Sequence, residues 1–209
     1  MALFVGIESI SKETLHNAHK DFNNPDNYEE NFKKYHDNGI TILAGMIFGF
    51  DEDDESTFER TVEFLVKHRI GLANFGILTP LPGTDVYKNL NAENRIFERD
   101  WSKYGASQVT FYPKKMSPER LKEGHIWAKK EFYSLSSLAK RYWANRHHPF
   151  FFLGMNYYYH LNAKRGHKEL PGHLEDMRVA EAAEIQRRQN MTDEEMVIQT
   201  LVDNCNPSD

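Results

Sequence analysis

The stretch ITILAGMIFGFDEDDESTFERTVEFLVKHRIGLANFGILTPLPG, residues 40–83, decides the fold of this chain. Its first part, Ile40 to Phe50, is apolar on both alternating faces except for its glycines, which predicts a buried parallel strand. After an acidic loop, Ser56 and Glu59 stand in capping-box spacing and apolar residues follow at helical intervals, so a helix of about three turns is expected. Leu72 to Thr79 returns as a second strand. A strand, a helix and a strand joined this tightly predict a right-handed crossover, with any ligand at the carboxyl ends of the strands.

The preceding residues extend this pattern. The apolar run ALFVGI, residues 2–7, predicts another buried strand and is followed by Glu8 and Ser9. Helices are expected over Lys12–His19 and Glu29–Asp37. The second should end at Asn38-Gly39, a pair typical of a helix cap with left-handed backbone conformation. The sequence therefore predicts an α/β fold with about three parallel strands and crossover helices.

The residues after the crossover predict mainly helices. We expect helices over Thr84–Asn91, Ser117–Ser134 and Leu135–Asn145, and a short strand at Gln108–Tyr112. The chain is accordingly divided into a barrel-like part, residues 1–112, a helical extension, residues 113–170, and a polar helical tail, residues 171–209.

Composition excludes several classes of protein. The 209 residues are 40% hydrophobic and carry a net charge of -5 from intermixed acids and bases, which gives no electrostatic footprint for nucleic acid. The single cysteine, Cys205, excludes both an intramolecular disulfide and a cysteine metal site. No charged leader opens the chain and no apolar run reaches the roughly 18 residues of a transmembrane helix, so a cytoplasmic location is expected.

An aromatic run, PFFFLGMNYYYHL at residues 149–161, is flanked by Arg141, Arg146 and Lys164. It favours a helix packed over the domain. A second interpretation stays open, in which Phe150–Leu161 lies on a membrane surface or contacts a lipid-like substrate, with the basic residues as anchors.

Four pieces of sequence occur in an order typical of one enzyme family: VGIES at Val5–Ser9, Lys20, the pattern Gly45-x-Ile47-x-Gly49-x-x-Glu52, and TPLPGT at Thr79–Thr84. Together they resemble the later half of the radical S-adenosylmethionine (SAM) enzyme core. The runs RDWSKY at Arg99–Tyr104 and MSPERL at Met116–Leu121 are similar to those of members that carry an amino-terminal cobalamin-binding domain. The resemblance covers roughly residues 2–145.

This resemblance implies a partial (β/α)6 barrel, of which the chain would supply the fourth, fifth and sixth strands. The fold would be half a TIM-like barrel followed by an all-helical carboxyl-terminal region. The residues that it places at the cofactor are Glu8, Ser9, Lys20, Gly45, Ile47 and Gly49.

The resemblance also implies roles for these residues. Glu8 would meet the ribose hydroxyls of SAM and Lys20 its methionyl carboxylate, pairings that suit a carboxylate acceptor and an ammonium donor. Gly45 and Gly49 would let the adenine approach the strand backbone. A purely structural interpretation stays open, in which Glu8 caps the next helix and the glycines relieve crowding in a tilted strand.

The family's CxxxCxxC loop, which holds a 4Fe-4S cluster, is missing here. Three thiolates are needed and the chain has one cysteine. We therefore expect a carboxyl-terminal fragment of a cobalamin-dependent, methyltransferase-like radical enzyme, inactive alone, with the cluster and cobalamin only in the full-length parent. Its partner would be the missing amino-terminal half or a second chain that completes the barrel, and no catalytic residue is assigned.

Two alternatives use other residues. A non-catalytic scaffold or interaction domain would pair Leu3–Ile7 with another chain. A metal-dependent hydrolase would use the acids Asp51–Glu55 with a nearby histidine, although an acidic helix entry explains these residues without a metal. The ten histidines show no ligand spacing such as HExxH.

Overall fold

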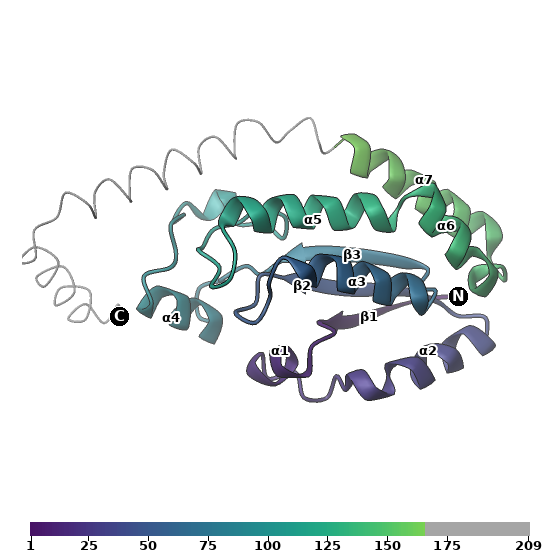
Figure 1. The fold of residues 1–209 in the computed structure, drawn as a ribbon, viewed down its shortest axis with the longest axis horizontal. Helices are drawn as coiled ribbons and strands as arrows, with labels where there is room; N and C mark the ends of the chain where they lie inside the picture. Colours follow the sequence, from purple (N-terminus) through teal and green to yellow (C-terminus); the bar gives the residue numbers. More distant parts are fainter. Residues whose placement is uncertain (166–209) are drawn as a thin grey trace, which may run out of the picture.

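The computed structural model describes residues 1–165, which form a parallel sheet with helices packed along it (Figure 1). The strands are β1 (Ala2–Glu8), β2 (Thr41–Phe48) and β3 (Leu72–Ile77). The helices are α1 (Lys12–Asn17), α2 (Tyr28–Asp37), α3 (Ser56–Lys67), α4 (Asp85–Ala92), α5 (Pro118–Phe132), α6 (Leu135–Tyr142) and α7 (Pro149–Arg165), with short 3-10 turns at 25–27, 101–103 and 143–145. The predicted α/β class with three parallel strands is confirmed. The polar tail, Cys205 and the end of the helical extension lie outside the described residues.

The sheet has the order β1-β2-β3, with both neighbouring pairs parallel. Its register places Gly6 of β1 opposite Gly45 of β2, and Gly45 opposite Asn74 of β3. Within the described residues β1 and β3 are therefore the two edges of the sheet. That this sheet is half of a barrel stays a prediction.

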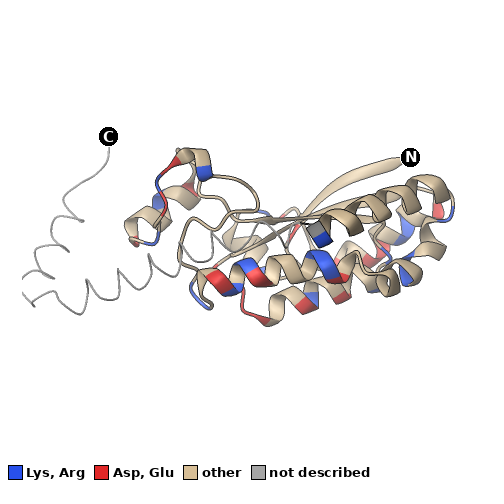
Figure 2. Cartoon of the chain, turned by 90° about the horizontal axis from the view of Figure 1, so that it is seen from above, with Lys and Arg blue, Asp and Glu red and all other residues tan. Residues whose placement is uncertain are grey.

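One face of the sheet is covered by helices and the other is open in the described part of the chain. Ile42, Ala44, Met46 and Phe48 point to the helical side and are buried. On the opposite face Phe4 is 60% exposed, Asn74 is exposed, and Leu43 and Ile47 are half-buried. Figures 1 and 2 show the helices along the sheet, with basic and acidic residues interspersed on them. The sequence predicted a strand β2 covered on both sides, and this holds on one side only.

The start of α3 differs from the predicted capping box. Ser56 is the first residue of the helix and not its cap, and the capping residue Glu55 makes no side-chain cap bond. Instead the Asp54 carboxylate accepts from the Ser56 backbone N–H at 2.9 Å and from the Ser56 hydroxyl at 2.6 Å. An acid placed before the first turn satisfies the free N–H group and complements the helix dipole, which makes the box unnecessary.

The predicted strand Gln108–Tyr112 is also wrong. Only one isolated antiparallel bridge, Ile96 to Phe111, forms there. Its alternating pattern has another cause, because Val109 and Phe111 are buried in the core and anchor an irregular segment. Periodicity alone does not distinguish such a segment from a strand.

Helix α7 packs on the domain by one side. Phe152 and Asn156 are fully buried, whereas Phe150 is 92% exposed. Arg141, expected as a basic anchor beside this helix, is itself fully buried, so it cannot lie at a membrane surface. Within residues 1–165 no helix has the length and apolar character needed to cross a bilayer.

Two helical glycines predict opposite effects of the same substitution. A Cβ at Gly124 of α5 would overlap the ring of Phe58, a buried residue of α3, whereas a Cβ at Gly154 of α7 meets nothing within 4 Å. We expect Gly154→Ala to stabilise the fold by up to about 1 kcal/mol through helix propensity. Gly124→Ala should destabilise it by about 1–3 kcal/mol, because overpacking outweighs the same propensity gain. Urea unfolding of both variants checks this, and equal gains in stability would contradict the packing of α5 on α3.

Candidate functional site

The open face of the sheet carries a row of three paired residues, two of which are glycines. Gly6, Gly45 and Asn74 are register partners across the three strands. A Cβ at Gly45 would lie 2.9 Å from the ring of Phe4, which shows that both residues stand on the same face. Gly45 is buried under the Phe4 ring, so a flat ligand could reach the strand backbone there once the largely exposed Phe4 side chain moves aside.

Glu8 contributes the acidic group beside this row. The register shifts between Gly6 and Glu8, and the Glu8 side chain folds back so that a Cβ at Gly6 would lie 2.7 Å from its Oε1 atom. Glu8 also has a φ of 66°, the left-handed region that a residue with a side chain rarely adopts. Such backbone strain, on the order of 1 kcal/mol or more, persists where the surroundings fix it and is frequent at functional sites.

Two side chains hold the bulge that precedes Glu8. The Asn23 amide donates to the carbonyls of Gly6 at 2.9 Å and Ile7 at 3.2 Å. The buried Tyr28 hydroxyl lies 3.3 Å from the carbonyl oxygen of Ile7, to which it donates. The strained conformation is therefore fixed from the helical side of the chain.

The remaining predicted residues lie in different surroundings. Ile47 is on the open face, and the buried Ser9 accepts from the Ser11 backbone N–H at 3.1 Å in the turn before α1. The Lys20 ammonium lies 5.5 Å from the centroid of the Phe22 ring. Gly49 has a φ of 102°, and a Cβ there would press on Leu121 at 3.0 Å, so it faces the core and a turn. The structure thus brings Glu8, Gly45 and Ile47 to one face, and Gly49 has a conformational reason to be glycine.

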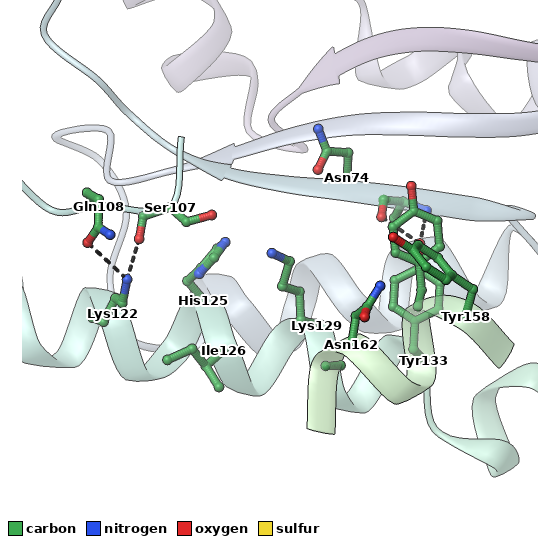
Figure 3. A pocket seen from close by; sticks show the side chains of 13 residues that line it. Asn74, Ser107, Gln108, Lys122, His125, Ile126, Lys129, Tyr133, Tyr158 and Asn162 are labelled. Carbon is green, nitrogen blue, oxygen red and sulfur yellow. Dashed lines mark hydrogen bonds between the residues drawn. The ribbon is translucent and has the colours of Figure 1, made fainter. Parts of the chain in front are cut away.

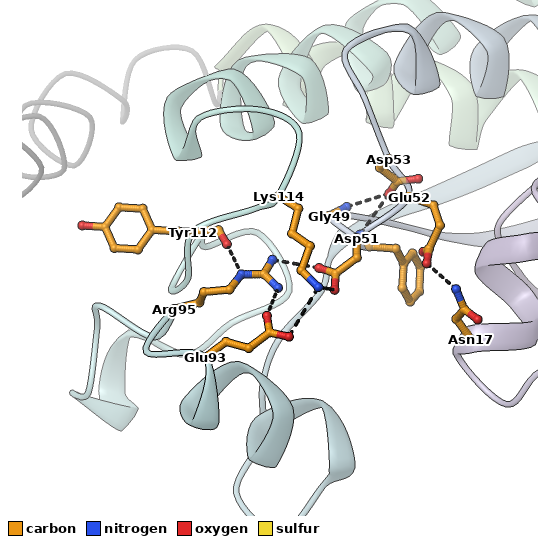
Figure 4. A network of polar contacts seen from close by, with 10 residues as sticks. Asn17, Gly49, Asp51, Glu52, Asp53, Glu93, Arg95, Tyr112 and Lys114 are labelled. Atoms are coloured by element: carbon orange, nitrogen blue, oxygen red, sulfur yellow. Dashed lines mark hydrogen bonds and ion pairs between the residues drawn. The ribbon is translucent and has the colours of Figure 1, made fainter. Parts of the chain in front are cut away.

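The acidic loop after β2 is engaged in ion pairs (Figure 4). Asp51 binds Arg95 and Lys114, each at 2.8 Å, and Glu93 binds Arg95 at 2.8 Å. Burial would raise the pKa of Asp51, but the bonds to Arg95 and Lys114 outweigh it and hold that pKa below its usual value. Within residues 1–165 no group of three or more His, Cys, Asp or Glu side chains is placed to hold a metal. These acids fasten the loop to the segment after α4, which accounts for them without a hydrolase site.

Asp53 makes the fold sensitive to pH. Its buried carboxylate accepts from the backbone N–H groups of Gly49 at 2.9 Å and Phe50 at 3.1 Å, and burial raises its pKa from 3.8 to about 6. Between these values the folded chain keeps a proton that the unfolded chain has released, so stability falls as pH rises through this window. The loss amounts to about 3 kcal/mol in total. Asp53→Asn keeps an acceptor and should flatten this fall, measured by urea unfolding from pH 4 to pH 7. If the unfolding free energies of the parent protein and of Asp53→Asn changed in parallel with pH, this role of Asp53 would be contradicted.

Three residues at or beside the open face were not predicted from the sequence as candidate site residues: Gly6, Asn23 and Asn74. Gly6 and Asn74 gain their meaning only from the strand register, which pairs both with Gly45. Asn23 sits in a loop rich in asparagine, and nothing in its spacing marks it as the residue that holds the bulge. If the pairing of β1 with β2 had been assumed, Gly6 could have been identified as a candidate site residue, since two paired glycines on neighbouring strands contribute no side chains there.

Known methyltransferases resemble this chain. It is 36% identical over 137 residues to bacteriochlorophyllide d C-12(1)-methyltransferase of Chlorobaculum tepidum, covering 66% of this chain and 30% of that protein. It is 27% identical over 117 residues to the C-8(2)-methyltransferase of the same organism, covering 56% of this chain and 26% of that enzyme. With the hopanoid C-2 methylase of Rhodopseudomonas palustris it shares 32% identity over 98 residues, 47% of this chain and 19% of that protein. No family model matches the chain.

These comparisons confirm the predicted relationship to methyltransferases, because the relatives are enzymes that carry this name. The chain spans less than a third of the length of each. It is therefore a homologue of one part of these enzymes.

Proposed function

We propose that this chain forms part of the SAM-binding barrel of a radical SAM enzyme of the methyltransferase type. The observation that carries the proposal is the pair of glycines, Gly6 and Gly45, on neighbouring strands with the Glu8 carboxylate folded over Gly6. The sequence motifs and the methyltransferase relatives support the same assignment. The proposal concerns one half of a site, since the chain corresponds to a minor share of those enzymes.

The residues of the open face suit the parts of SAM. The glycine row would admit the flat adenine, and the Glu8 carboxylate would accept from the two ribose hydroxyls. Lys20 would pair with the methionyl carboxylate, as the family resemblance implies. When bound, SAM would supply the methyl group or the radical, while these residues bind and orient it.

The iron-sulfur cluster does not fit this chain. Its ligation takes three thiolates, and the one cysteine, Cys205, lies outside the described residues. The cluster and cobalamin would thus be bound by another part of the parent enzyme. Within residues 1–165 the outer edge of β1 pairs with no strand, so its backbone groups are where a further strand would add. We propose that the rest of the barrel docks along this edge.

Substitution of Glu8 tests the proposal. In an NMR titration with SAM, Glu8→Gln should weaken binding by about tenfold or more, because hydrogen bonds to a charged acceptor contribute about 1.5–3 kcal/mol. Glu8→Gly should weaken it similarly without lowering the unfolding temperature, since glycine relieves the left-handed strain at this position.

Glu13→Gln on exposed α1 is the matched control, and it should leave SAM binding unchanged. Unchanged SAM affinity in both Glu8 variants would refute the proposed site. In that case the exposed Phe4 and the unpaired edge of β1 would favour the scaffold alternative, in which this surface only associates with another chain.

A further inference from the structure

A cavity of about 460 Å³ lies at the edge of β3, away from β1 (Figure 3). Its walls come from β3, the 107–108 segment, α5 and α7. The volume is within the range of about 300–1,000 Å³ typical of small-molecule sites. The proposed SAM site on the open face of the sheet does not use this cavity.

The charge of the cavity wall is positive. Lys122, His125 and Lys129 line it, and no aspartate or glutamate does. These residues lie at i, i+3 and i+7 of α5, so they share one face of the helix. A half-enclosed wall with two lysines and no acid favours an anionic ligand.

The two lysines differ in their partners. Lys122 donates to the Ser107 carbonyl and reaches the Gln108 side-chain oxygen at 3.4 Å, so its ammonium is committed to the wall. The Lys129 ammonium makes no hydrogen bond or ion pair within residues 1–165. Figure 3 shows its ammonium reaching toward β3 between His125 and the tyrosines. Burial lowers the pKa of Lys129, as expected for a cation that has lost water without gaining a partner.

His125 adds an unsatisfied polar atom to the same wall. The residue is 2% exposed, and its Nε2 atom donates to the Phe75 carbonyl at 2.9 Å because a carbonyl oxygen can only accept. Its Nδ1 atom has no hydrogen-bond partner in the described chain. Because this Nδ1 atom is shielded from solvent, it lies behind the cavity surface and offers no direct contact to a ligand.

The far wall is aromatic and rigid. Tyr133 and Tyr159 stack with their ring centroids 4.9 Å apart and an angle of 19° between the ring planes. The Tyr133 hydroxyl donates to the Ala73 carbonyl at 2.7 Å and accepts from the Ala73 N–H at 3.0 Å, which fixes the ring on β3. Because Tyr133 is 1% exposed, the half-buried Tyr159 ring presents most of the apolar surface that this pair offers to the body of a ligand.

We propose that the cavity binds an organic carboxylate, with Lys129 as the cationic partner of its carboxylate and the Tyr133–Tyr159 pair as the wall for its apolar body. A single uncommitted ammonium suits a singly charged head group, whereas phosphate sites gather several donors. Asn74 lines the cavity at the edge of β3 and is also the register partner of Gly45 on the open face. The inference does not depend on SAM binding.

Titration of the full chain with 3-phenylpropionate, followed by NMR, tests this proposal. We expect saturable binding with a dissociation constant on the order of 1 mM or below, and shifts at the amides of Asn74 and Ser107. The neutral 3-phenylpropionamide should bind at least about tenfold more weakly to the same protein. Lys129→Met should produce a similar loss, whereas Lys130→Met, the same charge change one residue along α5, should not.

Other outcomes of this titration would contradict the proposed carboxylate site. Absence of saturable binding, or equal affinity for the acid and the amide, would overturn the proposal whatever the stability of the variants. Inorganic phosphate that displaces 3-phenylpropionate with higher affinity would identify an oxyanion site instead. Because no step uses SAM, failure here leaves the SAM proposal intact, and failure of SAM binding leaves this one intact.

Discussion

Replacing Arg141 with methionine is expected to cost about 4 kcal/mol of unfolding free energy, on the scale of a broken buried polar network. The Arg141 guanidinium is fully buried and donates to the carbonyls of Ile70 at 3.1 Å, Gly71 at 2.8 Å and Phe132 at 2.8 Å, and to the Asn156 side chain at 2.9 Å. Methionine fills the space but removes all of these donors, although the Gly71 carbonyl still accepts from Asn156 and the Phe132 carbonyl from Ser137. Equilibrium unfolding in urea measures the loss.

The control is Lys140→Met on the same helix. Lys140 is exposed, so this change should stay within about 0.5 kcal/mol of the parent protein. Arg141→Lys should also lose most of the stability, because an ammonium cannot reproduce the planar set of donors that serves β3, α5 and α7 together. Near-parental stability of Arg141→Lys would show that charge alone, and not the donor geometry, holds these elements.

The second large effect concerns the open face. Gly45→Val should abolish detectable SAM binding while the chain stays folded, because the new side chain would occupy the position proposed for the adenine. A Cβ at this position meets only the end of the Phe4 side chain closely, and that side chain is 60% exposed and free to move aside. Valine also suits a strand, so stability should change little.

Gly105→Val is the matched control for this substitution. A Cβ at Gly105 meets nothing within 4 Å, so the change adds the same bulk away from the row. SAM titrations of both variants, together with circular dichroism for the fold, separate a blocked site from a damaged protein. Retained binding in Gly45→Val would place the cofactor, if it binds, away from the glycine row.

Much of the fold could be predicted from local patterns, because strands and crossover helices have strong periodicity. The run from Ile40 to Phe50 predicted β2, and the helix of about three turns expected after the acidic loop is α3, Ser56–Lys67. The failures occurred where local rules compete. Asp54 replaced the predicted capping box, and buried Val109 and Phe111 imitated a strand in an irregular segment.

The candidate site was harder to predict, because its parts depend on register and on backbone conformation. Gly45 was found from its motif, but Gly6 became significant only when β1 was seen to pair with β2. The left-handed φ of Glu8 has no sequence signal, since that conformation is usual for glycine and uncommon for glutamate. Arg141 was expected near a surface from its neighbours in sequence, although it is buried by the packing of α6 on α7 and β3.

The most direct measurement is a residue-resolved NMR titration of the chain with SAM. We expect weak but saturable binding, with a dissociation constant on the order of 1 mM, because the proposal assigns the rest of the SAM site to another part of the parent enzyme. The shifts should be confined to Gly6, Glu8, Lys20 and Gly45. Absence of any shift at these residues would contradict the account. So would affinity in the micromolar range or tighter, which would mean that the chain alone already forms a complete site.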